Sequence, residues 1–531
     1  MTLFYFSRQL LGLKETRKMI NGNENTGSAY NAADDLIERN LNAGRGEKIA
    51  FIDANGQYTF KQVGQKAAQF SNVIQKLGLK KESRLVLVML DSIEFIACFL
   101  GAIKAGVIPV PLNTRLTPRD YSYIIADTNA AALVISSSLV DTVLEETKPP
   151  ELVLVDGVSS EYKMLAQVTS DSPSTFVTAI TKPDDICFWL YTSGTTGLPK
   201  GVIHLHSHLL PTADLYAIPF LKISSGDIVF SAAKLFFAYG LGNALTFPMA
   251  VGATSILLPG PPDPKSVINI LTKHQPTLFF GVPTLFAMLL ASELPPKNGH
   301  SIRLSVSAGE PLPADLFHRW KAKVGTEILD GIGTTEMLHI FVSNQIKDIH
   351  PGTTGRVVPG YKTRLINELG EICGINEIGI LEVSGPTSAL MYWAQREKTK
   401  STFRGEWTRT GDNYTIDKTG VMTYHGRNDD MLKVGGIYVS PFEVEGALIK
   451  HQSVLEAAVI GYADQDELIK PKAFVVLDDN FNPSEELKEE LKDFVRNELA
   501  AYKYPRWIEF SDALPKTATG KIQRFKLRDK P

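Results

Sequence analysis

Continuous apolar runs alternate with helix-spaced apolar residues along the first two thirds of the chain. Residues 84–89 and 132–135 are largely apolar, as strands buried on both faces are, whereas residues 59–77 repeat their apolar positions at the spacing of a helix. Similar apolar runs recur at 255–258, 277–281 and 305–307. This alternation predicts an α/β fold, with βαβ-type sheets covered by helices.

The apolar period shortens toward two residues between positions 380 and 423. Such a period is typical of half-buried strands, and we expect two of them at 379–383 and 420–424. The pattern therefore predicts a β-rich subdomain that completes the large N-terminal domain.

A compact segment at the C-terminal end has a pattern of its own. It contains apolar runs at 455–460 and 473–477 and an amphipathic helix over 484–501. We expect it to form a small mobile α+β domain. The predicted division is an N-terminal extension over 1–30, a large domain over 31–427 and the small domain over 428–531.

Length and composition are those of a soluble protein with more than one domain. The chain has 531 residues, of which 44% are hydrophobic, and a formal net charge of -3 with both signs mixed along it. We therefore expect small-molecule partners and no nucleic acid. Cys98, Cys187 and Cys373 lie far apart in apolar segments, which favours reduced thiols and a cytoplasmic location.

We expect neither a membrane span nor a secretory signal. The longest apolar stretch, 95–112, is interrupted by Lys104 and two prolines. The first 18 residues lack a basic start and a continuous apolar core, and Met19 is an alternative start.

Residues 191–201 read Tyr-Thr-Ser-Gly-Thr-Thr-Gly-Leu-Pro-Lys-Gly and lie between two apolar runs. Glycines let backbone N–H groups approach an anion, the hydroxyls donate to phosphate oxygens, and Lys200 adds a positive charge. Pro199 precedes the lysine, so the spacing differs from that of a Walker A loop. The run predicts a phosphate-binding loop, and the alternative is a solvated linker.

With this loop and five further blocks in order, the chain resembles the adenylate-forming superfamily of acyl-CoA synthetases, adenylation domains and luciferases. The resemblance extends from about Asn31 to Lys526. The five blocks are 308–311 (Ala-Gly-Glu-Pro), 331–336 (Gly-Ile-Gly-Thr-Thr-Glu), 409–412 (Arg-Thr-Gly-Asp), 426–430 (Gly-Arg-Asn-Asp-Asp) and 515–521 (Pro-Lys-Thr-Ala-Thr-Gly-Lys).

The resemblance implies a site for ATP and Mg²⁺. Thr335 would contact the α-phosphate, Glu336 would bind Mg²⁺, Asp412 would accept hydrogen bonds from the ribose hydroxyls, and Arg427 would reach the ribose and phosphates. The expected phosphate loop comprises Thr192, Ser193, Gly194, Thr195, Thr196, Gly197 and Lys200. The expected nucleotide border comprises Ala308, Gly309, Glu310, Pro311, Asp330, Gly331, Ile332, Gly333 and Thr334.

Further matches imply coenzyme A and a moving domain. Lys521 would contact the substrate carboxylate and the α-phosphate, where it stabilises the charge of the adenylation transition state. Asp429 matches the hinge between two working conformations. Gly435 and Gly436, together with Lys433, match the segment that lines the pantetheine tunnel; a simple hairpin turn is the alternative.

Two segments resemble the branch of benzoate-CoA and 4-hydroxybenzoate-CoA ligases. They are 234–243 and 337–344. Elsewhere in the superfamily the position of Phe237 often carries histidine. The resemblance implies a short, flat pocket for an aromatic acid, walled by Phe237, Ala238, Tyr239, His339 and Ile340 with Ala308 and Gly333.

The sequence thus favours an ATP-dependent aryl-acid CoA ligase, with benzoate or a hydroxybenzoate as substrate. The alternatives are a stand-alone adenylation enzyme that loads a carrier-protein thiol and a short- or medium-chain acyl-CoA synthetase. A nucleotide-sensing protein without activity is disfavoured, because the charged positions of the superfamily are all present. The oligomeric state stays open, a homodimer included.

Overall fold

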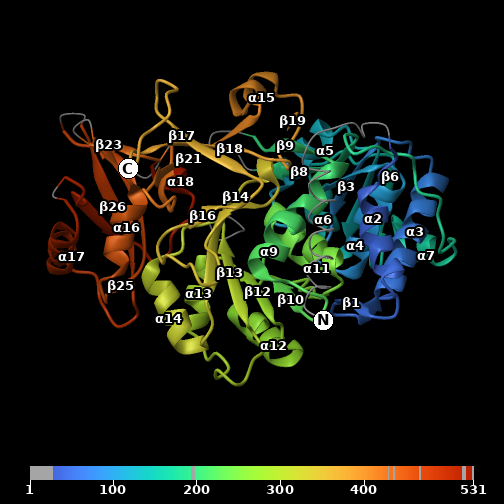
Figure 1. The fold of residues 1–531 in the computed structure, drawn as a ribbon, viewed down its shortest axis with the longest axis horizontal. Helices are drawn as coiled ribbons and strands as arrows, with labels where there is room; N and C mark the ends of the chain where they lie inside the picture. Colours follow the sequence, from blue (N-terminus) through green and yellow to red (C-terminus); the bar gives the residue numbers. More distant parts are fainter. Residues whose placement is uncertain are drawn as a thin grey trace, which may run out of the picture.

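The computed structural model describes residues 28–192, 198–428, 430–434, 437–465, 468–500, 502–516 and 522–528. Its largest element is a nine-stranded sheet at the centre of the molecule (Figure 1), with the strand order β16-β15-β14-β13-β12-β10-β11-β1-β2. The strands from β14 to β1 in this order are parallel, and both ends of the sheet are antiparallel. The strand bounds are β1 Ile49–Ile52, β2 Gln57–Thr59, β10 Ile228–Ser231, β11 Thr254–Ile256, β12 Leu278–Gly281, β13 Leu304–Ala308, β14 Ile328–Gly333, β15 Ile340–Ser343 and β16 Arg356–Val357.

This sheet is buried on both faces. Phe279 and Phe280 are neighbours on β12 and fully buried, and they belong to two different core clusters because successive strand residues point to opposite faces. The cluster around Phe279 includes Trp320 of α14, and the cluster around Phe280 includes Phe247 of α11. The helices of this half are α8 Leu209–Thr212, α9 Ile218–Leu221, α10 Ala238–Leu241, α11 Phe247–Val251, α12 Pro264–His274, α13 Pro283–Leu290 and α14 Ala314–Val324.

A second sheet, all parallel, has the order β4-β3-β5-β6-β7. Helix α3 begins after Thr59, whose hydroxyl and backbone form a capping box with Gln62, and it packs against α4. The bounds in this half are β3 Arg84–Val88, β4 Ile108–Pro111, β5 Ala132–Ser136, β6 Leu152–Asp156, β7 Lys163–Met164, α2 Ala32–Asn42, α3 Phe60–Lys76, α4 Ile93–Lys104, α5 Pro118–Asp127, α6 Val140–Leu144 and α7 Leu165–Ser170.

A three-stranded antiparallel sheet carries the predicted phosphate loop. Its order is β19-β9-β8, and the loop joins β8 to β9. The strands are β8 Ile186–Thr192, β9 Lys200–Leu205 and β19 Met391–Tyr392, and helix α15, Arg396–Thr402, follows β19.

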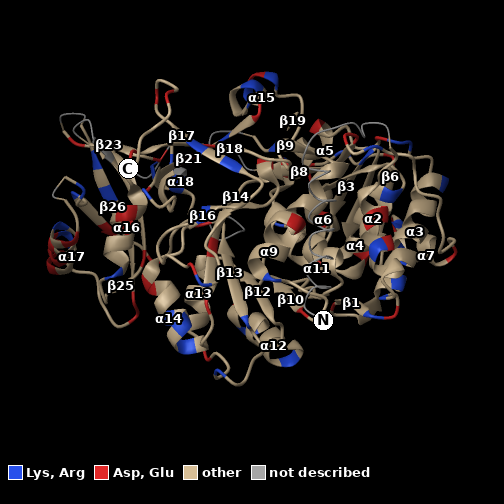
Figure 2. Cartoon of the chain, in the orientation of Figure 1, with Lys and Arg blue, Asp and Glu red and all other residues tan. Residues whose placement is uncertain are grey.

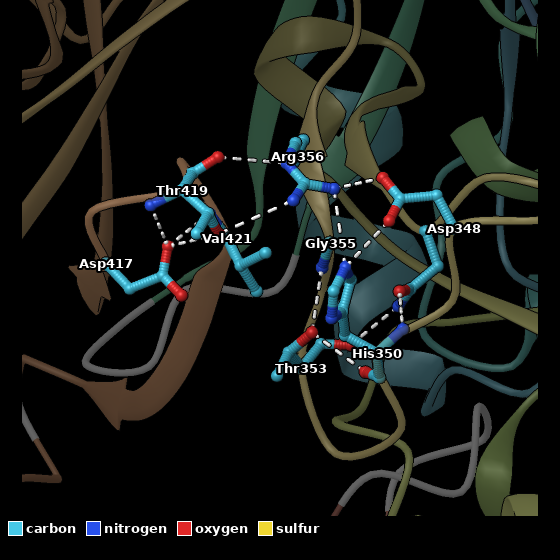
Figure 3. A network of polar contacts seen from close by, with 9 residues as sticks. Asp348, His350, Thr353, Gly355, Arg356, Asp417, Thr419 and Val421 are labelled. Atoms are coloured by element: carbon cyan, nitrogen blue, oxygen red, sulfur yellow. Dashed lines mark hydrogen bonds and ion pairs between the residues drawn. The ribbon is translucent and has the colours of Figure 1, made fainter.

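The expected β-rich region forms an antiparallel sheet with the order β17-β18-β21-β20, and β22 pairs with β21. Arg356 of β16 ties this sheet to the large one, as Figure 3 shows: it contacts Asp348 and His350 on one side and donates to the Thr419 carbonyl at 3.1 Å on the other. The strands are β17 Lys362–Ile366, β18 Gly379–Ser384, β20 Phe403–Arg404, β21 Trp407–Ile416 and β22 Met422–Arg427.

The C-terminal part is smaller and α+β. The amphipathic helix appears as α17, with Leu487, Leu491 and Val495 buried on one stripe. The elements are β23 Leu432–Val434, β24 Ile437–Val439, α16 Pro441–Ile449, β25 Val454–Ala463, β26 Ile469–Leu477, α17 Glu485–Glu498, β27 Trp507–Phe510 and α18 Arg524–Arg528. The predicted fold class is therefore confirmed: mixed α/β, with large sheets and a smaller C-terminal domain.

The charge distribution, the cysteines and the length of the helices bear on the other predictions made from the sequence. Lysines and arginines are interspersed with acidic residues on helix α17 (Figure 2). Cys98 and Cys187 are buried, whereas Cys373 is only half-buried. Among the described residues, no helix is both long enough and apolar enough to cross a membrane.

Candidate active site

The carboxyl ends of β13 and β14 bring two of the predicted blocks together. These strands are parallel neighbours, and Ala308 lies opposite Gly331 in their register. The chain then turns through Thr334 and Thr335 and returns antiparallel as β15, where Gly333 pairs with Ile340. Ligands bind at such strand ends in α/β proteins, because the backbone groups of the loops there are not used in strand pairing and can contact a ligand.

Contacts from distant segments fix the turn between β14 and β15. Its 3₁₀ segment comprises Thr335, Glu336 and Met337, and the three carbonyl oxygens each accept a hydrogen bond. The Thr335 carbonyl accepts from the His204 ring Nε2 at 2.8 Å. The Glu336 carbonyl accepts from the Ala389 backbone N–H at 2.7 Å, and the Met337 carbonyl accepts from the Thr387 hydroxyl at 2.7 Å. The backbone that carries Glu336 is thus held in one conformation.

Leu338 ends this segment with a positive φ of 66°. The His339 N–H donates to the Met337 carbonyl at 2.8 Å across it, which closes a tight three-residue turn. Non-glycine residues adopt such backbone angles only where the surrounding contacts impose them. The turn therefore fixes the path from Glu336 to His339.

Glu336 is half-buried and receives a hydrogen bond from a residue that no sequence block contained. The Tyr392 hydroxyl donates to Glu336 Oε1 at 2.6 Å. Burial, together with the negative charge of Glu336, raises the pKa of Tyr392 far above its usual value, so the hydroxyl stays protonated. Within the described part of the chain, Glu336 makes no ion pair.

The chemistry around Glu336 fits a magnesium ion that is shared with a phosphate ligand. Mg²⁺ prefers carboxylate and phosphate oxygens and keeps part of its water shell. Among the described residues, no group of three or more His, Cys, Asp or Glu side chains forms a closed metal cage. A single carboxylate, which leaves further coordination positions to phosphate oxygens and water, matches this mode of binding.

Lys200 lies at the start of β9, and its Nζ is 5.2 Å from the centre of the Tyr392 ring. This distance is that of a cation–π contact. Thr192 pairs with Lys200 across β8 and β9 at the base of the loop. Lys200 and Glu336 thus contact the same tyrosine, the lysine at its ring and the glutamate at its hydroxyl.

Asp412 and Arg427 also lie together. They face one another on β21 and β22, and Arg427 Nη1 donates to Asp412 Oδ1 at 3.2 Å and to the Thr410 carbonyl at 3.1 Å. The negative charge of Asp412 raises the pKa of Arg427, and Glu336 contributes in the same direction. The Asp412–Arg427 pair therefore lies close enough to Glu336 to interact with it electrostatically.

In the expected nucleotide border, Ala308, Asp330 and Gly331 are buried, and the other residues are half-buried or exposed. Gly309 adopts a φ of 93°, and Glu310 accepts a hydrogen bond from the Thr284 hydroxyl at 3.0 Å. Asp330 is 6% exposed, and its Oδ1 has no hydrogen-bond partner among the described residues. Burial raises the pKa of Asp330 well above its usual range, which favours a protonated carboxyl.

Helix α10 and the turn at His339 bring together the residues that were predicted to wall the acid pocket. The centres of the Tyr239 and His339 rings are 5.6 Å apart, and those of Phe247 and His339 are 4.5 Å apart in an edge-to-face contact. Phe237 and Ala238 at the start of α10 are half-buried, while Ile340 is fully buried.

The polar atoms of the pocket are partly engaged by the protein itself. The Tyr239 hydroxyl donates to the Val306 carbonyl at 3.1 Å, in the middle of β13. His339 Nε2 contacts Asn243 Oδ1 at 3.1 Å, and Nδ1 has no partner among the described residues. Burial lowers the pKa of His339 to about 3, so the ring is neutral. Asn243 lies in a π-helical turn, Gly242–Thr246, and such turns are frequent at functional sites.

The three histidines after the loop serve the protein interior. His204 contacts the Thr335 carbonyl, His206 Nδ1 accepts from the Ala32 N–H at 3.2 Å, and His208 Nδ1 lies 3.2 Å from His204 Nδ1. Burial lowers the pKa of each below its usual value. His204 was not among the predicted site residues, although it holds one of them.

Part of the predicted site lies outside the described residues. This part comprises Ser193, Gly194, Thr195, Thr196 and Gly197 of the loop, Asp429, Gly435, Gly436 and Lys521. Lys433 belongs to β23, and its side chain also falls outside the description.

The fold and the clustered residues define an adenylate-forming enzyme. The chain belongs to the AMP-binding enzymes: that family matches residues 37–393, and the AMP-binding enzyme C-terminal domain matches residues 443–521.

Relatives and solved structures similar to this chain include aryl-acid CoA ligases. The benzoate–CoA ligase of Thauera aromatica is 54% identical over 94% of this chain and 96% of its own, and the 4-hydroxybenzoate–CoA/benzoate–CoA ligase of Rhodopseudomonas palustris is 46% identical over 94% of each. The crystal structure of a benzoate CoA ligase from Burkholderia xenovorans LB400 is 48% identical and superposes with a TM-score of 0.89 over 94% of this chain and 100% of that chain.

Proposed function

We propose that the chain is an ATP-dependent CoA ligase for benzoate and closely related aryl acids. The observation that carries this proposal is the turn between β14 and β15. It holds Glu336, at the phosphate side, and His339, in the aromatic pocket, on one short and fixed stretch of backbone. A bound acid and the phosphates of ATP would therefore meet at a set distance.

The reaction has two steps. A carboxylate oxygen of the acid attacks the α-phosphorus of ATP, the bond to pyrophosphate breaks, and an aryl adenylate forms. The sulfur of CoA then attacks the acyl carbon, the thiol proton leaves to solvent, and AMP departs as the thioester forms. No side chain of the protein needs to form a covalent intermediate.

The described residues supply several of the necessary contacts. Lys200 and Thr192 would bind the outer phosphates, Thr335 the α-phosphate, and Asp412 and Arg427 the ribose. Glu336 would hold Mg²⁺, which when bound would neutralise phosphate charge. Each contact would act on charge that shifts during adenylation.

The acid pocket favours a ring that bears few polar groups. The Tyr239 hydroxyl is already bound to backbone, and His339 Nε2 to Asn243. Among the described residues, His339 Nδ1 has no hydrogen-bond partner and would be able to accept from or donate to a ring substituent. An aryl acid whose ring hydroxyl cannot reach such a partner would bind more weakly, because the hydrogen bonds that the hydroxyl makes to water are not replaced.

The domain division and the hinge remain part of the proposal. We place the boundary at residues 428–430, between the end of β22 at Arg427 and the start of β23 at Leu432, with Asp429 as the hinge. Lys521 would serve adenylation, and Gly435 and Gly436 with Lys433 would serve the CoA step. A cytoplasmic location is supported by three cysteines that form no disulfide.

The proposal is tested by pyrophosphate release from MgATP in the presence of benzoate, 4-hydroxybenzoate, 2-aminobenzoate, cinnamate, acetate or hexanoate, each with and without CoA. We expect turnover with benzoate and formation of benzoyl-CoA. Turnover with aliphatic acids alone would refute the assigned pocket. Pyrophosphate release with aryl acids but transfer only to a carrier protein would instead identify a carrier-loading adenylation enzyme.

A further inference from the structure

Tyr392 contacts two of the predicted phosphate-site residues at once, although it lies in none of the sequence blocks. It belongs to β19, a strand of two residues that pairs with β9, the strand that begins at Lys200. Met391 lies opposite Ile203, and Tyr392 lies opposite Val202. The tyrosine is thus carried by the same small sheet as the phosphate loop.

The backbone around Tyr392 is held on both sides. The Leu390 N–H donates to the Ile203 carbonyl at 2.9 Å, and the Trp393 N–H donates to the Gly201 carbonyl at 2.8 Å. The Tyr392 N–H donates to the Thr399 hydroxyl at 3.1 Å. These hydrogen bonds fix the position of the Tyr392 backbone, from which the side chain extends, relative to β9.

The side chain itself has little freedom. Tyr392 is 4% exposed and packs with Val202 and Ala389, and its ring lies 5.4 Å from the ring of Phe403. From this position its hydroxyl reaches Glu336 Oε1 at 2.6 Å, the length of a hydrogen bond to a charged acceptor. The direction of that hydroxyl is set by packing, before any ligand binds.

The ring makes the second contact, with Lys200 Nζ at 5.2 Å from its centre. Lysine and glutamate side chains of one site attract each other and can pair directly when no ligand is present. Within the described residues no ion pair joins Lys200 to Glu336, and Tyr392 offers each of them a contact of its own. One rigid side chain therefore meets both charges.

We propose that Tyr392 is a positioning residue for the nucleotide site: it orients the Glu336 carboxylate through Oε1, leaves Oε2 for the metal, and holds Glu336 apart from Lys200. This inference rests on the proposed function, in which Glu336 binds Mg²⁺. A free glutamate side chain has several rotamers, and fixing it in advance removes an entropic cost from ligand binding.

The test is Tyr392→Phe, which removes the hydroxyl and keeps the ring. Calorimetry of ATP binding with and without Mg²⁺ gives the factor by which Mg²⁺ tightens binding. We expect this factor to fall about 10-fold or more in the variant, because a hydrogen bond to a charged group is stronger than one between neutral groups. The KM for MgATP should rise, while that for the aryl acid stays within about 2-fold.

A matched control is Tyr121→Phe. Tyr121 is also buried, and its hydroxyl donates to the Asn113 carbonyl at 2.8 Å in another sheet region. We expect this variant to lose stability to a similar extent and to keep the Mg²⁺ factor of the wild type. If Tyr392→Phe behaves like Tyr121→Phe, Tyr392 is merely structural and the inference is overturned.

A double-mutant cycle shows whether Tyr392 acts through Glu336. In a Glu336→Ala background, Tyr392→Phe should have no further effect on the Mg²⁺ factor, because its target is gone. An equal effect in both backgrounds would overturn the inference. Wild-type protein that fails to bind MgATP would refute the proposed function itself, so the two failures are distinguishable.

Discussion

Asp412 and Arg427 face one another across the antiparallel strands β21 and β22, with Arg427 Nη1 3.2 Å from Asp412 Oδ1. The two residues come from separate sequence blocks, and their pairing follows from strand register alone. The Asp412 side chain is 7% exposed and that of Arg427 is 36% exposed, so the pair is only partly screened by water.

We predict that Asp412→Ala weakens both ATP binding and the fold. The substitution removes the expected acceptor for the ribose hydroxyls and leaves Arg427 without its charged partner. ATP affinity should fall at least 10-fold, and the free energy of unfolding by about 1–3 kcal/mol. Calorimetry and urea denaturation measure the two effects. Unchanged ATP affinity would contradict the assigned role of Asp412.

Gly240→Ala should disrupt the acid pocket. A Cβ at Gly240 would lie 2.0 Å from the Lys234 carbonyl oxygen and 2.5 Å from that of Ala233, so the backbone of α10 must move. We expect a loss of about 2 kcal/mol or more in stability and a large fall in kcat/KM for the aryl acid. Thermal denaturation and steady-state kinetics provide the measurements.

Gly446→Ala in α16 is the matched control for that variant. A Cβ there meets no atom within 4 Å, and alanine favours a helix more than glycine does. This substitution should stabilise the protein by about 0.5–1 kcal/mol and leave kinetics unchanged. Similar behaviour of the two variants would show that close packing at Gly240 has no special importance.

His339→Ala should act on the acid and not on the nucleotide. The change removes the ring that packs between Tyr239 and Phe247 and leaves Asn243 without its partner. We expect the KM for the aryl acid to rise at least 10-fold and the KM for ATP to change less than 2-fold. A rise in the KM for ATP alone would place His339 outside the acid pocket. His425→Ala, at a half-buried histidine bound to Thr415, is the control.

Stability should fall as the pH drops below about 6.5, because buried histidines stay neutral in the folded state. Burial lowers the pKa of His204 and His206 to about 4 from the usual 6.5. The unfolded chain therefore binds protons that the folded protein does not, and the penalty grows from pH 6.5 down to about 4. At pH 5 it is about 2 kcal/mol for each histidine.

Two buried carboxyls act in the opposite sense. Burial raises the pKa of Asp91 and Asp156 to about 6 from 3.8, so the folded state binds their protons first and gains stability as the pH falls from 6 to about 4. Denaturation at pH 7.5 and pH 5.0 tests the net effect. His206→Gln should reduce the difference between the two pH values by about 2 kcal/mol. An unchanged difference would show that His206 does not titrate as described.

Sequence patterns located most elements because their physical cause is local. The helix expected over 484–501 is α17, Glu485–Glu498, and the strand expected at 132–135 is β5, Ala132–Ser136. Apolar spacing reports which side of an element is buried, and this depends on neighbours in sequence. The ends differ by a few residues, because caps and fraying set them.

Other site residues could not be found in this way. Tyr392 contacts Glu336 across 56 positions of sequence, Asn243 contacts His339 across 96, and His204 contacts Thr335 across 131. Each was an ordinary residue of an apolar or polar run. Nothing local distinguishes a tyrosine that orients a carboxylate from one that fills a core.

The sequence by itself determined the class of fold, the family blocks and the chemical types of the residues that would bind ATP, because these depend on composition and short spacings. Only the tertiary structure decided which side chains meet. Strand register set Asp412 opposite Arg427, and the pairing of β19 with β9 brought Tyr392 into contact with both Lys200 and Glu336. Such contacts arise when distant segments are packed into one core, and their energy depends on distances that exist only in the folded chain.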